Sequence, residues 1–182
     1  MKKNFFVLFY FVISNVFSNT LWQKISSENI KIEGIRKIIP QKYNLLQLNN
    51  AAFQLFQQSI PTEQSRQSVI IDLPTPEGDF IKFKIFELPC MDPILAAKFP
   101  TIKTYQALCV DNPAITAKLD YTSFGFHAMV FSPKGVYFID PFSTSNTGYY
   151  TCYYKKDYSK ISNSNTACQQ DIIEKTQAHS SH

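Results

Sequence analysis

The sequence has few of the residues and motifs that common enzyme classes require. Its 182 residues include five glycines, and no glycine-rich loop precedes a predicted helix, which argues against a phosphate-binding loop. The motifs H-E-x-x-H and C-x-x-C are absent, so neither a metallohydrolase ligand set nor a zinc ribbon is predicted. His179 and His182 are spaced H-x-x-H, but the polar tail around them gives a metal no rigid frame. We therefore expect no catalytic residue, metal ligand or cofactor in this chain.

Long apolar runs are also lacking, with one exception at the N-terminus. Lys2 and Lys3 precede the apolar run Phe5–Ile13, which is too short to span a bilayer comfortably. A basic start followed by a short apolar run is typical of a secretory signal, so residues 1–18 are predicted to be a signal peptide. An N-terminal lipid-facing anchor or a buried strand is the less favoured alternative. We expect a secreted or periplasmic protein that is free of the membrane after signal removal.

Charged residues of either sign are too few to indicate a particular class of binding partner. The formal net charge is +4, and it falls close to +2 when the two lysines of the predicted signal are removed. Proteins that bind nucleic acid through its phosphates usually carry a denser basic surface. No nucleic-acid partner is predicted.

The four cysteines suggest disulfides, because the chain is predicted to be exported. An even count in an exported chain is typical of a disulfide framework. Sequence proximity favours pairing Cys90 with Cys109 and Cys152 with Cys168, although four cysteines permit three pairings. Free, buried thiols are the alternative.

What the chain has in quantity is aromatic residues in alternating runs. Aromatics make up 15% of the sequence, as in a packed, β-rich globule. The clearest run, Thr122–Pro141, predicts a hairpin that turns at Ser132–Gly135 and ends at Asp140–Pro141, since proline has no amide for the ladder. The side chains expected in the core are Phe83, Ile85, Phe124, Phe126, Val130 and Phe138.

Further runs complete a predicted α+β fold, a mainly antiparallel sheet of six or seven strands with two short helices. Asn49 or Asn50 is expected to cap the first helix, and Asp92 the second, whose Ile94, Leu95 and Phe99 would face the sheet. The segment 21–40 is expected to drape over the surface. Residues 19–158 are predicted to be one β-rich domain, and residues 159–182 a polar linker or tail. The other predicted strands cover residues 43–48, 69–73, 81–85, 101–110, 114–120 and 149–154.

Two side-chain groups are candidates for function. Cys109 and His127 would form a thiol dyad if neighbouring strands brought them together, with Asp120 or Asp140 orienting the ring. His127 lies in an apolar strand, however, where a hydrogen-bonded core histidine is the commoner case. A recognition surface could be made by Tyr149, Tyr150, Tyr153 and Tyr154, although strand residues that simply cover a sheet are the favoured interpretation.

Several short blocks occur in a characteristic order along Leu21–Asp157. They are Leu21–Lys24 (LWQK), Ser68–Pro74 (SVIIDLP) with Glu77 and Gly78, Met91–Pro93 (MDP), Leu95–Pro100 (LAAKFP), Ile102–Tyr105 (IKTY), Gly125–Met129 (GFHAM) and Tyr137–Pro141 (YFIDP). In these blocks the chain resembles the N-terminal pro-region of secreted bacterial, Flavobacteria-type, reprolysin-like zinc metallopeptidases. In that family a catalytic zinc domain follows the pro-region, and no catalytic residue maps onto this chain.

The resemblance implies a domain that helps a metallopeptidase catalytic domain to fold and holds it inactive during export. Its partner would be that catalytic domain, in the same chain or a separate one. A pro-region thiolate can fill the open zinc position, and Cys168 is the candidate inhibitory thiol, with a disulfide role as the alternative. The competing hypotheses are a free-standing extracellular module that binds a peptide or glycan, and a truncated metallopeptidase fragment without a separate role.

Overall fold

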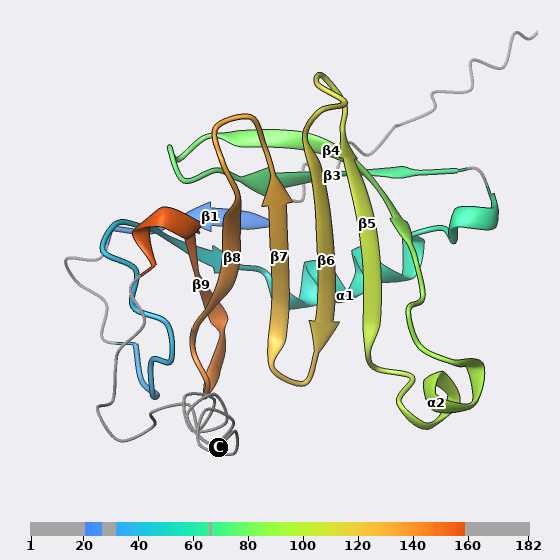
Figure 1. Ribbon diagram of the computed structural model, residues 1–182. Coiled ribbons are helices and arrows are strands. Elements are labelled where there is room, and N and C mark those ends of the chain that lie inside the picture. Colours follow the sequence, from blue (N-terminus) through green and yellow to red (C-terminus); the bar gives the residue numbers. More distant parts are fainter. Residues whose placement is uncertain (1–20, 27–31, 66, 159–182) are drawn as a thin grey trace, which may run out of the picture.

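The computed structural model describes residues 21–26, 32–65 and 67–158, which form one antiparallel sheet with two short helices (Figure 1). Within these residues the sheet has nine strands, more than the six or seven expected. The predicted signal peptide and the tail from 159 to 182 lie outside the described residues. The strands are β1 (Trp22–Lys24), β2 (Asn44–Leu48), β3 (Val69–Pro74), β4 (Phe80–Glu87), β5 (Lys103–Cys109), β6 (Thr116–Thr122), β7 (Gly125–Phe131), β8 (Tyr137–Ser143) and β9 (Asn146–Tyr154). The helices are α1 (Asn50–Ser59) and α2 (Pro93–Lys98), and 3-10 turns cover Glu63–Ser65 and Lys155–Asp157.

The sheet curls until its two ends nearly meet. The strand order is β1-β2-β9-β8-β7-β6-β5-β4-β3, so β3 to β9 form a continuous meander and β9 pairs with β2. The Asn44 side-chain amide of β2 donates to the carbonyl of Pro76, 2.7 Å away in the turn after β3, and so joins the two ends. The fold is therefore mostly β, a nearly closed antiparallel sheet, and the coarse sequence prediction is confirmed.

The inner face of the curled sheet holds the core. In β4, Phe83 and Ile85 are fully buried while Lys82 and Lys84 are exposed, as the alternation predicts. Helix α1 lies behind the strands β5 to β7 in Figure 1 and inserts Phe53, whose ring is 5.2 Å from that of Phe126. Each such side chain contributes on the order of 1.5 to 3 kcal/mol through burial, so the inner face accounts for much of the stability.

The local signals at helix ends and at the main hairpin are confirmed. The side chain of Asn49 accepts a bond from the Ala52 amide, and Asp92 caps α2 in the same way. The β7–β8 hairpin turns where expected, with the Gly135 amide bonded to the Ser132 carbonyl and Gly135 at φ 121°. That φ lies in the left-handed region, which glycine adopts at low cost.

The prediction that Pro141 ends the second strand of the hairpin is wrong. Strand β8 continues to Ser143, and the pairing with β9 shifts between Pro141 and Ser143. A shift of this kind is a β-bulge, and bulges are among the few places where a sheet accepts proline.

Some predicted contacts with the core are also wrong. Phe124 is 68% exposed, because it lies in the turn before β7 rather than in the strand. On α2, the side chains of Ile94, Leu95 and Phe99 are exposed and do not face the sheet.

The segment expected to drape over the surface instead supplies part of the core. Trp22 forms β1 with its neighbours and is only 3% exposed. Its ring meets those of Phe126 and Tyr150 edge to face, at 5.4 and 5.3 Å, and such pairs stabilise beyond area burial. No helix among residues 21–26, 32–65 and 67–158 is long and apolar enough to cross a bilayer.

Candidate functional site

The outer face of β5 to β8 carries a long hollow, which we call the outer groove. Its floor is made by residues that point away from the core, among them Gln106, Met129 and Phe138. One part has a volume of about 700 Å³ and extends over β5 to β8, and a second part of about 270 Å³ lies between Phe124 and Ile38. Phe124, His127 and Asp140 line both parts, so the two parts of the groove meet at these residues.

Two segments border the groove. On one side the loop that follows β4 contributes Leu88 and leads into α2, at the lower right of Figure 1. On the other side lies the segment 32–43, which contacts the end of β8 and the residues that follow β9. The Ser143 hydroxyl donates to the carbonyl of Glu33 at 2.8 Å, and the Arg36 guanidinium lies 4.1 Å from the centre of the Phe142 ring. The segment 32–43 is therefore fixed to the sheet as a wall.

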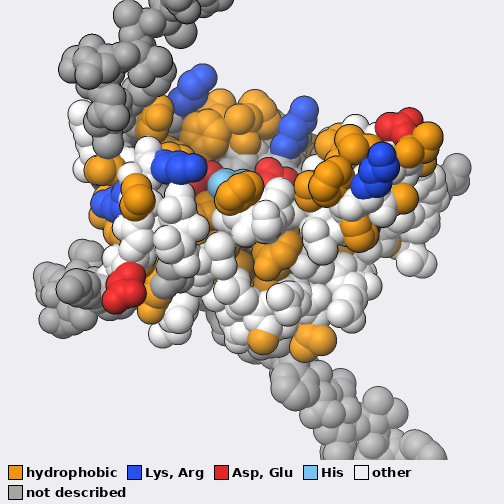
Figure 2. Space-filling view, turned by 90° about the horizontal axis from the view of Figure 1, so that it is seen from below, with side chains coloured by type: hydrophobic (Ala, Val, Ile, Leu, Met, Phe, Trp, Pro, Cys, Tyr) orange, Lys and Arg blue, Asp and Glu red, His pale blue; other side chains and the backbone are white. Residues whose placement is uncertain are grey.

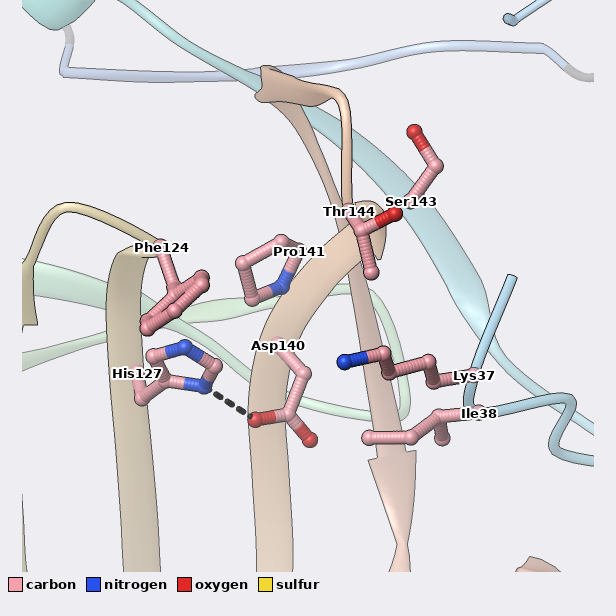
Figure 3. A pocket seen from close by; sticks show the side chains of 8 residues that line it. All are labelled: Lys37, Ile38, Phe124, His127, Asp140, Pro141, Ser143 and Thr144. Carbon is pink, nitrogen blue, oxygen red and sulfur yellow. Dashed lines mark hydrogen bonds and ion pairs between the residues drawn. The ribbon is translucent and has the colours of Figure 1, made fainter. Parts of the chain in front are cut away.

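A hydrogen-bonded network ends at the shared part of the groove. The ring nitrogen Nδ1 of His127 is 2.8 Å from Oδ1 of Asp140 (Figure 3). The hydroxyl of Tyr153 donates to Oδ2 of Asp140 at 2.6 Å. A carboxylate only accepts hydrogen bonds, so Nδ1 of His127 carries the proton. The other ring nitrogen, Nε2, lies on the side of the ring away from Asp140, toward Phe124 (Figure 3).

Burial and charge set the protonation of these groups. Burial raises the pKa of Tyr153 well above its usual range, and Asp140 adds to the effect, so Tyr153 is a neutral donor. Burial by itself lowers the pKa of His127, but the hydrogen bond and charge of Asp140, together with the charge of Asp120, raise it above its ordinary value. The histidine is thus held between two carboxylates.

Asp120 is the second of these carboxylates. It lies on β6 directly opposite His127 on β7, and such pairs have Cβ atoms about 4.5 to 5.5 Å apart. Burial raises the pKa of Asp120, while His127 opposes that shift. Figure 2, which looks at the molecule from below, shows the described histidine between acidic and hydrophobic side chains.

The predicted dyad of Cys109 and His127 does not form. Cys109 is buried in the core, whereas His127 points into the outer groove. The residue of β5 level with His127 is Thr104, because Thr104 pairs with Asp120 and Asp120 with His127. Cys109 lies five residues further along β5, roughly 16 Å away at 3.3 Å per residue. The orienting role expected of Asp140 is confirmed by its bond to the ring.

The described cysteines are free thiols, so the predicted Cys90–Cys109 disulfide is wrong. Cys109 and Cys152 are buried, which agrees with the alternative of free, buried thiols, and burial raises the pKa of Cys152. Cys168, the candidate inhibitory thiol and predicted partner of Cys152, lies outside the described residues. Cys90 borders the groove, but its loop follows β4, and β4 lies three strand spacings from β7, roughly 14 Å at about 4.8 Å per spacing.

Of the four tyrosines of β9, two are buried and two are half-buried. Tyr150 and Tyr153 are buried, and the hydroxyl of Tyr150 accepts a bond from the Phe126 amide. Tyr149 and Tyr154 are half-buried, and Tyr154 donates to Glu77 at 2.6 Å. Two of the four therefore serve the fold and offer no free surface for recognition.

Sequence reasoning missed the role of Phe124 and Lys37 as groove residues. The signal that could have identified Phe124 is the short run Thr122–Gly125, which is typical of a tight turn and not of a continuing strand. Lys37 had no such signal, since it is far from β7 in sequence.

Metal ligation has no geometric support in the part of the chain that the structure describes, where no three His, Cys, Asp or Glu side chains gather closely enough to hold an ion. Comparison of the chain with protein-family models, with curated proteins and with solved structures finds no match.

Proposed function

We propose that this chain is a secreted binding domain that holds an extended polypeptide in the outer groove and performs no catalysis itself. In the form that the sequence resemblance implies, the polypeptide belongs to the catalytic domain of a zinc metallopeptidase, and the chain acts as its pro-region. A free-standing peptide-binding module would use the same surface.

The observation that carries this proposal is the group of exposed apolar side chains on the outer face of the sheet, of which Met129 lines the groove and Leu108 and Phe131 lie beyond its lining. Leu108, Met129 and Phe131 point away from the core and are 37 to 38% exposed. The solvent face of an antiparallel sheet is usually polar, and apolar side chains gathered on it are typical of an interaction surface. Binding a partner here would remove these side chains from water.

The size of the groove supports an extended chain as the occupant. The floor spans about 14 Å between β5 and β8, because neighbouring strands lie about 4.8 Å apart. A strand with its side chains is about 10 Å thick, so one extended segment fits between the two walls. A partner that binds only the folded domain would also stabilise it by mass action, and the same holds for a protease bound to its pro-region.

The proposal includes no catalytic step because the groove lacks a positioned nucleophile. A histidine oriented by a carboxylate can act as a general base, but Cys90 lies in the loop after β4, roughly 14 Å and three strand spacings from β7. The hydroxyls of Thr104 and Thr122 each form a hydrogen bond with the backbone. Thr104 donates to the carbonyl of Leu88, and Thr122 accepts from the Phe124 amide.

Selection from a phage-displayed peptide library on the immobilised domain tests the groove. We expect enriched peptides whose binding is abolished by Met129→Glu, because a charge in the floor opposes desolvation. The matched control is Leu55→Glu, since Leu55 is 67% exposed on α1 and distant from the groove floor. No enrichment, or binding that survives Met129→Glu, would refute the proposal, and binding to a glycan array instead would identify a different ligand class.

The pro-region form has its own test. The reading frame downstream of His182 would encode H-E-x-x-H, and the expressed catalytic domain would be inhibited by this chain. If Cys168 supplies a zinc-bound thiolate, Cys168→Ser weakens inhibition and leaves the melting temperature nearly unchanged. A lower melting temperature with full inhibition would instead make Cys168 a disulfide partner, and the blocking would then come from the domain surface.

A further inference from the structure

One carboxylate in the outer groove has no partner. Asp120 is half-buried, yet within the described residues its carboxylate makes neither a hydrogen bond nor an ion pair, whereas the carboxylate of Asp140 accepts bonds from both His127 and Tyr153. A partly desolvated carboxylate without a donor is costly, and a bound donor or cation would offset that cost.

A second acceptor lies opposite this carboxylate. Since Nδ1 of His127 holds the proton in its bond to Asp140, Nε2 of the neutral ring offers a lone pair to the groove. Asp120 and Nε2 therefore both require a hydrogen-bond donor. A ligand that supplies donors and positive charge satisfies both.

An aromatic ring completes the arrangement. Phe124 is 68% exposed, and its position is fixed by the bond from its amide to the Thr122 hydroxyl and by Gly125 at φ 104°. A side chain at Gly125 would come within 3.2 Å of Pro141, so the tight turn needs glycine. The ring of Phe124 lies beside that of His127 (Figure 3), where its face can meet a cation.

The chain itself sends an ammonium group into the same cavity. Lys37 extends from the segment 32–43 toward Asp140 (Figure 3), yet it forms no ion pair among the described residues. The cavity thus accommodates a flexible, positively charged side chain without binding it tightly.

We propose that Asp120, His127 and Phe124 form a subsite for a cationic group, an ammonium or guanidinium such as the end of a Lys or Arg side chain. This subsite would select a cationic side chain of the bound polypeptide, and in that role the inference rests on the proposed function. Met129 and Phe138 would contact the apolar stem of such a side chain, since both line the adjoining floor.

The same geometry makes binding dependent on pH. Protonated His127 would place a positive charge between the two carboxylates, where it compensates Asp120 and repels an incoming cation. Occupancy of the subsite should therefore be highest above the pKa of His127 and fall as the pH drops through that pKa. Because protonated His127 would be a like charge close to the bound cation, we expect the affinity to fall about tenfold or more. The charged and titratable groups that face His127 from the surrounding elements are Lys37, Cys90, Lys118, Asp120, Asp140 and, through Asp140, Tyr153.

NMR titration with n-butylguanidinium and its neutral analogue n-butylurea tests the subsite without any peptide. Replacing His179 and His182 by Gln leaves His127 as the single histidine to observe. At pH 8 we expect a saturable shift of the His127 ring signals with butylguanidinium and none with butylurea. Acidification to pH 5.5 should weaken binding about tenfold or more.

Variants separate a specific site from general attraction. Asp120→Asn should weaken binding about tenfold or more, while Asp111→Asn, with the same charge change in an exposed loop, should not. Lys37→Met should strengthen binding, because it removes the competing ammonium. An equal response to butylurea, or an unchanged affinity in Asp120→Asn, would overturn the subsite. If the library peptides still bound in a manner sensitive to Met129→Glu, the groove proposal would stand without it.

Discussion

Replacing Phe126 by Ala should be among the most damaging single changes in this domain. The side chain is fully buried and meets three other rings, those of Trp22, Phe53 and Tyr150, at 5.4, 5.2 and 6.3 Å. Truncating a buried Phe to Ala typically costs about 3 to 5 kcal/mol. Each lost aromatic pair adds about 0.5 to 1.5 kcal/mol beyond area burial, so we expect a loss in the upper part of that range.

The assays are urea and thermal unfolding, followed by the fluorescence of Trp22, which is the single tryptophan, and by circular dichroism. A loss of about 4 kcal/mol should lower the melting temperature by roughly 10 to 20 °C for a domain of this size. Phe126→Leu keeps an apolar side chain at the site and should lose less stability, which gives a measurable value if the Ala variant does not fold.

Phe124→Ala is the matched control, because the same residue type lies two positions earlier in the chain. Its ring is 68% exposed, so truncation should change the free energy of unfolding by no more than about 0.5 kcal/mol. Equal losses for the two variants would refute the argument, since they would show that Phe124 is buried and that the turn before β7 is misplaced.

Three further predictions concern titration, thiols and metal. The pKa of His127 is raised in the folded state, so the charged form adds stability that is present below about pH 6.5 and lost as the pH rises through the folded pKa; His127→Gln should therefore cost more stability at pH 5.5 than at pH 9 in urea unfolding. In a Cys168→Ser background, a thiol reagent should label exposed Cys90 quickly and buried Cys109 and Cys152 only after unfolding, and early labelling of the buried pair would contradict their placement. The purified chain should bind no zinc stoichiometrically, and one tightly held ion per chain by metal analysis would contradict this.

The sequence alone predicted the local features, namely which strand residues face the core and where the helices begin. Alternation in β4 identified which side chains face the core, because successive residues of a strand point to opposite faces. Asn49 and Asp92 identified two helix starts, since a side-chain oxygen there satisfies an amide that the helix leaves free. These signals depend on neighbours within a few residues, so no knowledge of the fold was needed.

Only the tertiary structure decided which of these side chains are buried and which of them meet in the groove. Phe124 and Phe126 are two residues apart, and strand alternation therefore predicts that both side chains face the same side. However, β7 begins only at Gly125, which has φ 104°, so Phe126 is buried and Phe124 is not. Asp120 and Asp140 could be named as partners of His127, yet only the register of β6, β7 and β8 leaves one carboxylate satisfied and the other free. Trp22 completes the core from a distant part of the chain, because closure of a curled sheet depends on contacts that no local pattern encodes.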